Sequence, residues 1–169
     1  MHRGLLIAAL VAILSGAASL ARADTPLPPG WTRVPPTSVT VPAGALCPFS
    51  LQIQDVKDEV ITKVLQTFPD GSPRSQIFIG ELITRFTNVS SGASVTRNLS
   101  GDGFVRYGSD GSSSWTFVGP AATVIFPGSF LAPGFYVVNG FYVIDYAGDG
   151  TQTIPIHEGP NENLCETLR

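Results

Sequence analysis

The sequence predicts an all-β protein, an antiparallel meander of about eight strands that forms a small β-barrel or a barrel-like sandwich. Short runs of β-branched and aromatic residues alternate with turn residues, and Asp-Gly pairs recur at hairpin-like spacing. No window of helical periodicity extends beyond about two turns. Cys47 and Cys165 flank the predicted strands, and a disulfide between them would bring the first and last strands together, which favours a closed barrel.

The first residues have the features of a secretory signal peptide, which we assign to residues 1–23. His2 and Arg3 precede an apolar run over residues 5–14, and residues 21–23 offer an A-x-A cleavage site. The apolar run falls short of the about 20 residues that a membrane-spanning helix needs. We therefore expect cleavage, secretion into the extracellular space and no membrane span in the mature protein.

Residues 24–45 are predicted to form a proline-rich arm, because six prolines fix φ and donate no hydrogen bond. A single β domain over residues 46–169 follows. Arg3 and Arg22 would leave with the signal peptide while every acidic residue stays, so the net charge would move from −3 to −5. The remaining basic residues are scattered singly, which argues against a nucleic-acid partner. The sequence leaves the oligomeric state open.

The β domain divides into strands at its glycine and proline turns. The predicted strands span residues 51–56, 60–68, 76–88, 94–99, 104–107, 114–118, 122–126, 134–146 and 152–157. Gly80 predicts a bulge or bend within residues 76–88. Glycine supplies the positive φ that tight turns require, so Asp-Gly pairs predict hairpin turns. These pairs are Asp70-Gly71, Asp102-Gly103, Asp110-Gly111 and Asp149-Gly150.

Residues 134–146 are the most strongly β-forming run of the chain, and both faces of this run are apolar. Such a strand is covered on both sides, or faces a core on one side and a partner or ligand on the other. Asn139-Gly140 also suits a hairpin turn, so residues 135–138 could pair with residues 141–144. We favour one strand bent at Gly140, because four-residue arms are short.

Several short motifs resemble those of a group of uncharacterised small secreted actinobacterial proteins with a cysteine-bounded domain. The motifs are Cys47-Pro48-Phe49, Thr67-Phe68-Pro69-Asp70-Gly71, Phe86-Thr87-Asn88, Asn98-Leu99-Ser100-Gly101, Asp110-Gly111, Pro127-Gly128, Asp149-Gly150 and Asn163-Leu164-Cys165. They span nearly the whole mature domain and are mostly turn chemistry. The resemblance implies an exported all-β domain, and it transfers no activity and no site residues.

The sequence offers few candidates for catalysis. His157 is the one histidine of the mature chain, and no nucleophile elbow or zinc-binding set accompanies it, so we expect no metal and no cofactor. Glu81 and Arg85 lie four residues apart in sequence, on one face of a predicted strand. A partly buried Glu81 paired with Arg85 would be a candidate catalytic carboxylate. A charge pair at a barrel mouth or on a solvated face explains the same residues.

Aromatic residues are concentrated in the second half of the chain, more densely than a one-sided sheet of this size needs. They either fill the core or line a cavity for one small apolar or aromatic ligand, with Trp115, Phe117, Tyr136 and Tyr142 as the candidate binding residues. We therefore expect a secreted binding module. The alternatives are an extracellular protein-interaction protein and a cofactor-free barrel enzyme of the cyclase or isomerase kind, so enzymatic activity stays open.

Overall fold

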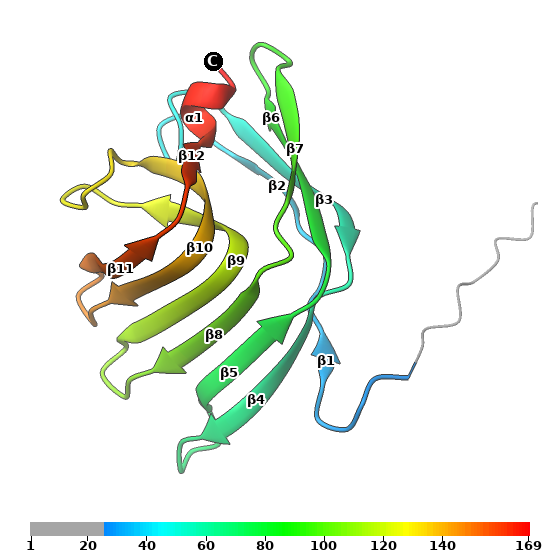
Figure 1. Cartoon of the computed structure of the whole chain (residues 1–169), viewed down its shortest axis with the longest axis vertical. Helices are drawn as coiled ribbons and strands as arrows, with labels where there is room; N and C mark the ends of the chain where they lie inside the picture. The colour runs from blue at the N-terminus through cyan, green and yellow to red at the C-terminus, as the bar shows by residue number, and fades with distance from the viewer. Residues whose placement is uncertain (1–25) are drawn as a thin grey trace, which may run out of the picture.

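The computed structural model describes residues 26–169, and these residues form twelve strands and one short helix (Figure 1). The strands are β1 (Thr32–Arg33), β2 (Ser38–Val41), β3 (Leu51–Asp58), β4 (Ile61–Thr67), β5 (Pro73–Ile79), β6 (Leu82–Asn88), β7 (Ser94–Asn98), β8 (Asp102–Tyr107), β9 (Ser113–Ile125), β10 (Gly134–Tyr146), β11 (Gln152–Glu158) and β12 (Asn161–Asn163); the helix is α1 (Leu164–Thr167). Within this part of the chain, no helix has the length and apolar character to cross a membrane. The predicted signal peptide lies outside the described residues.

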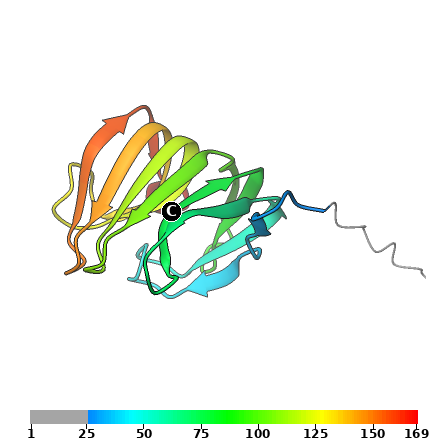
Figure 2. The same cartoon turned by 90° about the horizontal axis from the view of Figure 1, so that it is seen from below.

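The strands are arranged in two antiparallel sheets. The larger sheet has the order β1-β4-β5-β8-β9-β10-β11, with β12 also paired to β10, and the smaller sheet has the order β2-β3-β6-β7. Figure 2 shows the larger sheet as a curved layer with the smaller sheet against one side of it. The all-β antiparallel prediction is confirmed. Neither strand order closes on itself across residues 26–169, so the structure shows no closed barrel.

The predicted Cys47–Cys165 disulfide is present, with the two Cα atoms 5.2 Å apart. Cys47 lies just before β3 of the smaller sheet, whereas Cys165 lies in α1, directly after β12 of the larger sheet. The disulfide therefore joins two packed sheets rather than the two edges of one sheet. This arrangement brings the ends of the domain together without the barrel that the cysteine positions suggested.

Glycines from neighbouring passes of the chain lie side by side and form a line that we call the glycine crease. The crease consists of Gly80, Gly101, Gly119, Gly140 and Gly159. Gly119 and Gly140 are direct cross-strand partners, and the registers of the flanking strands align the other three with them. A Cβ atom on Gly140 would overlap the carbonyl oxygen of Glu158, so the backbones approach more closely here than any other residue would allow.

The crease bends β9 and β10 without ending them, whereas strands end on either side of Gly80, Gly101 and Gly159. β10 is one strand from Gly134 to Tyr146, and Gly140 has a φ of 141°, which confirms the single bent strand over the hairpin. The predicted separation of residues 114–118 from 122–126 is wrong, because β9 remains paired to β10 straight through Gly119. Asp102-Gly103 is also not a turn, because both residues pair with β9 inside the sheet.

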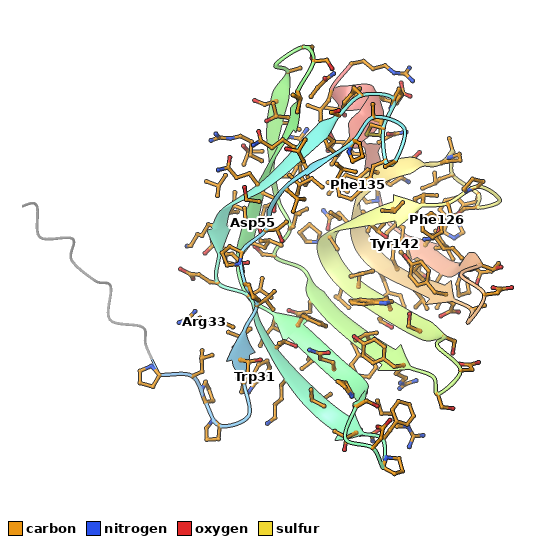
Figure 3. The ribbon with its side chains drawn as sticks, turned by 180° about the vertical axis from the view of Figure 1, so that it is seen from behind. Trp31, Arg33, Asp55, Phe126, Phe135 and Tyr142 are labelled. Carbon is orange, nitrogen blue, oxygen red and sulfur yellow. A yellow bond between two sulfur atoms is a disulfide. The ribbon has the colours of Figure 1, made fainter. Side chains whose placement is uncertain are left out.

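The two faces of β10 pack into separate hydrophobic cores. Phe135 and Val137 pack against the smaller sheet, where Phe86 and Leu51 are fully buried. On the opposite face, Tyr142 belongs to a second core inside the curl of β9 and β10. Figure 3 shows Phe135 between the sheets and Tyr142 on the other side of the bent strand. Both apolar faces of residues 134–146 are therefore used.

The remaining three Asp-Gly pairs form hairpin turns as predicted. In each turn the aspartate accepts a hydrogen bond from the backbone N–H two residues later, at 2.9 Å for Asp70, 3.0 Å for Asp110 and 2.9 Å for Asp149. Hydrogen bonds from the side chain and backbone of that residue lower the pKa of each carboxyl. These local contacts explain why the turns were readable from the sequence.

Part of the proline-rich segment belongs to the sheets. β1 pairs with β4 at the end of the larger sheet, and β2 pairs with β3 at the edge of the smaller one. Both strands lie between the prolines, where backbone N–H groups remain free to pair. This segment therefore crosses from one sheet to the other next to the glycine crease.

Candidate functional site

A cleft of about 250 Å³ opens where the smaller sheet separates from β9, and we call it the crease cleft. On one side of the glycine crease, β5, β8 and β9 form one continuous sheet. On the other side, the chain continues from β5 into β6 of the smaller sheet, while β9 stays with β10. The divergence leaves a wedge whose lining includes Gly101 and Gly103, two positions without side chains to fill it.

Three aromatic side chains form one wall of the crease cleft. Phe78 stacks on Trp115 with ring centroids 5.8 Å apart and an angle of 24° between the ring planes, and Trp115 stacks on Phe117 at 5.9 Å and 17°. Strand register explains this row, because Phe78 is paired with Gly103 and Gly103 with Phe117, which places all three on one face. Trp115 lies two residues from Phe117 and therefore shares that face. All three rings are half-buried.

The rest of the lining is mainly aliphatic. It includes Val34, Val60, Leu82, Leu99, Ala121 and Ala122. These residues come from the β1–β2 segment, the β3–β4 connection, the two sides of the β6–β7 hairpin and β9. Small side chains on β9 leave room in front of the aromatic wall. A concave, largely apolar surface with few polar groups is typical of a small-molecule site.

The polar lining of the crease cleft comes from Thr37, Asp55 and Asp58. One oxygen of Asp55 (Oδ2) accepts a hydrogen bond from the backbone N–H of Thr37 at 2.6 Å, and the other (Oδ1) accepts from the Thr84 hydroxyl at 2.7 Å. Asp58 Oδ1 accepts from the Val60 backbone N–H at 2.9 Å. No lysine, arginine or histidine is among the described residues that line the cleft.

The structure divides the four predicted ligand-binding residues into two pairs. Trp115 and Phe117 face the crease cleft. Tyr136 and Tyr142 are 4% and 1% exposed in the second core, which adjoins the cleft at Phe117, the cross-strand partner of Tyr142. Their hydroxyls donate to backbone carbonyls, Tyr136 to Ala132 at 3.0 Å and Tyr142 to Gly159 at 2.8 Å. The two tyrosines are therefore satisfied core residues.

Sequence reasoning missed Phe78 as a cleft residue. On the predicted strand 76–88, Phe78 shares one face with Leu82 and Phe86, and Phe86 is fully buried in the core between the sheets. The bend at Gly80 carries Phe78 out of that core and into the row with Trp115. A glycine in the middle of an apolar strand face is the one sequence signal for such a change of surroundings.

The predicted catalytic candidates lie outside the crease cleft. Glu81 is exposed and accepts a hydrogen bond from Lys57 Nζ at 2.6 Å, rather than pairing with Arg85. That hydrogen bond is the main cause of a raised Lys57 pKa. Arg85 is exposed on the outer face of β6, because inner and outer residues alternate beyond the bend. The partial burial expected for Glu81 is therefore not observed.

His157 and the acidic residues give no further site. His157 lies exposed on β11 and stacks on Phe130 with ring centroids 3.9 Å apart. Across residues 26–169, no group of three or more His, Cys, Asp or Glu side chains is placed to hold a metal ion. Among the clefts of residues 26–169, we take the crease cleft as the candidate site because a row of three aromatic rings forms one of its walls.

No protein-family model, no curated protein and no solved structure significantly matches this chain. The resemblance to small secreted actinobacterial proteins thus stays a prediction.

Proposed function

We propose that this protein is a secreted binding domain that holds one small aromatic ligand in the crease cleft. The observation that carries the proposal is the row of Phe78, Trp115 and Phe117, whose half-buried rings line a cleft, with Phe117 also packed against the edge of the second core. Burial of such rings against a ligand is favourable in proportion to the apolar area removed from water. Pockets for drug-sized ligands measure about 300–1,000 Å³, so a cleft of about 250 Å³ suits a smaller ligand of one or two rings.

Secretion is supported by two independent features. The N-terminal residues follow the signal-peptide pattern, and the disulfide fits an oxidising compartment. The mass of the protein recovered from its own culture medium tests this part of the proposal. We expect a chain that begins at Asp24 and lacks the two hydrogens that the Cys47–Cys165 disulfide removes. A full-length mass, or free thiols, would contradict it.

A binding role fits the geometry better than the cyclase or isomerase alternative. Glu81 and Arg85, the acid–base candidates, are exposed and do not line the aromatic cleft. The alternative of a protein partner has one supporting observation: the cross-strand neighbours Val118 and Phe141 are 53% and 38% exposed beside the crease. Small groups of exposed apolar side chains are also common on monomeric proteins, so the cleft remains the better-supported site.

Titration with tryptophol, a neutral indole alcohol, tests the proposal by NMR. The chain has two tryptophans, so the indole Nε1–H signal of Trp115 can be assigned by comparison with a Trp31→Phe variant. We expect tryptophol to shift the Trp115 signal and to leave that of Trp31 unchanged. Gly103→Leu should fill the cleft and abolish the shift, whereas Tyr142→Phe should preserve it, because it removes only a hydroxyl that bonds to the Gly159 carbonyl and does not line the cleft.

Binding at another site would appear as shifts that Gly103→Leu leaves in place, and that result would refute the cleft. Gly103→Ala provides a milder second variant in case the leucine prevents folding. If neither tryptophol nor a charged analogue with the same ring binds, the small-ligand proposal is refuted. The exposed surface around Val118 would then be the next candidate site.

A further inference from the structure

We propose that the crease cleft selects cationic ligands, specifically an aromatic ring system that carries a protonated amine. This inference rests on the proposed function and adds the chemical class of the ligand. It follows from three features of the site: the sign of the charges that line the cleft, the orientation of nearby lysines, and the nature of the aromatic wall.

The charged residues among the described lining are both carboxylates, Asp55 and Asp58. An ionised carboxylate offers about four lone-pair positions and only accepts hydrogen bonds. The contacts to Thr37 and Thr84 use one position on each oxygen of Asp55, and the contact to Val60 uses one position of Asp58. Both carboxylates therefore keep acceptor capacity for a donor group on a ligand. A ligand ammonium group supplies three such donors and the opposite charge.

Two lysines on the adjacent strands β3 and β4 do not neutralise the charges of these carboxylates. Lys57 lies between Asp55 and Asp58 in sequence, but its Nζ pairs with Glu81 at 2.6 Å and with Glu59 at 3.6 Å. Lys63 of β4 points to the opposite face of the larger sheet, where its Nζ lies 6.0 Å from the centroid of the Trp31 ring. Both side chains are thus engaged away from the cleft, which keeps its lining acidic.

The aromatic wall favours the same sign of charge. The face of an aromatic ring is electronegative and attracts a cation within about 6 Å, most strongly for tryptophan. A flat ring on the ligand can stack on Trp115 or Phe117 while its amine reaches the carboxylates. An anionic analogue would meet both the negative ring faces and two carboxylates. The cleft therefore discriminates by charge as well as by shape.

Three analogues with the same indole ring test this inference: tryptamine (cationic), tryptophol (neutral) and indole-3-propionate (anionic). We expect tryptamine to bind about tenfold more tightly than tryptophol, as one charge-assisted contact in a half-open site allows, and indole-3-propionate to bind most weakly. The preference should diminish as salt is added, because the carboxylates are partly exposed to solvent. Trp115 chemical shifts and calorimetry give the affinities.

Asp58→Asn is the decisive variant, because an asparagine keeps a side-chain oxygen to accept the Val60 N–H and removes only the charge. It should bring tryptamine close to the affinity of tryptophol. Glu59→Gln is the matched control: it changes the charge by the same amount at the neighbouring position, outside the cleft, and should preserve the preference. Asp55→Asn is a second variant, with the same expectation as Asp58→Asn.

The outcomes separate this inference from the function on which it rests. Equal affinities for tryptamine and tryptophol would overturn the cation preference and leave small-ligand binding intact. A preference for tryptamine that survives both Asp58→Asn and Asp55→Asn would also overturn it. Absence of binding for all three analogues would instead refute the proposed function itself.

Discussion

Substituting Gly140 by alanine probes the glycine crease at its most crowded point. Gly140 has a φ of 141°, a region that residues with a side chain rarely adopt. Its added Cβ atom would overlap the Glu158 carbonyl oxygen and would approach the Gly159 backbone. Because the neighbours are backbone atoms and not flexible side chains, β10 and the β11–β12 connection would have to move apart.

The magnitude follows from two terms. Backbone strain at such a φ costs about 1–3 kcal/mol. Separation of the strands also threatens the hydrogen bond from the Asn139 N–H to the Pro160 carbonyl, 2.9 Å long and worth about 1 kcal/mol, together with nearby packing. We therefore expect Gly140→Ala to lower the free energy of unfolding by about 2–4 kcal/mol, which corresponds to about 7–14 °C in Tm for a domain of this size.

Gly150→Ala is the control, because Gly150 also has a positive φ, 84°, but a Cβ atom there meets nothing within 4 Å. It should cost only the strain term, about 1–2 kcal/mol. Urea unfolding followed by tryptophan fluorescence, and thermal unfolding followed by circular dichroism, give both values. If the two variants lose the same stability within about 0.5 kcal/mol, close backbone approach does not explain the crease.

Three further changes test the packing within and between the two sheets. Reduction of Cys47–Cys165, which closes a separation of 118 residues, should lower the unfolding free energy by about 5 kcal/mol in the chain-entropy model; urea midpoints that agree with and without reductant would contradict this. Glu162→Gln removes an ion pair with Arg97, whose hydrogen bond lowers the pKa of Glu162, and should cost about 1 kcal/mol at neutral pH. Because that stabilisation is lost as the pH falls through the lowered pKa, the cost should vanish in acid, and a cost independent of pH would argue against the pair. Tyr136→Phe removes a buried hydroxyl with two hydrogen bonds and should cost about 1–2 kcal/mol with no change in tryptophol affinity; weakened binding would place this residue in the site after all.

Local chemistry was the part of the fold that the sequence allowed us to predict. The Asp110-Gly111 turn and the bend at Gly140 depend on one or two residues with special φ values, and both were anticipated. Asp102-Gly103 is the same dipeptide as in the Asp-Gly turns, but it lies inside β8. There Gly103 is paired with both Phe78 and Phe117, and its missing side chain leaves room for their rings. A dipeptide cannot distinguish these two uses of glycine. The neighbouring strands make the distinction.

The pairing of strands was the part that could not be predicted. The division into two sheets depends on β7 and β9 separating beyond the crease, and no local pattern records which strand pairs with which. A longer-range signal was present: the crease glycines recur at intervals of 18 to 21 residues, from Gly80 to Gly159. Such spacing is that expected when each pass of a meander places one glycine in the same row. Trp115 and Phe117 could be proposed as binding residues from the aromatic composition of the chain alone. Phe78 could be added to them only by recognising the row of crease glycines.

Gly101 and Gly103 occupy neighbouring positions on one face, and substituting each of them tests stability and ligand binding separately. A Cβ atom on Gly101 would lie against the backbone of Gly119 and the Pro120 carbonyl, so Gly101→Ala should destabilise the crease. A Cβ atom on Gly103 would lie 3.6 Å from the Phe78 side chain and 3.9 Å from that of Phe117, ordinary contact distances, so Gly103→Ala should leave stability nearly unchanged.

The same alanine at position 103 occupies space between two rings of the aromatic wall and should weaken tryptophol binding. Urea unfolding and NMR titration of both variants measure the two properties separately. If Gly103→Ala loses stability and keeps its affinity, the aromatic row is part of the core and the cleft has no binding role. Loss of affinity at constant stability is expected only of a surface on which a ligand rests, and it would identify Gly103 as the position that sets the size of that ligand.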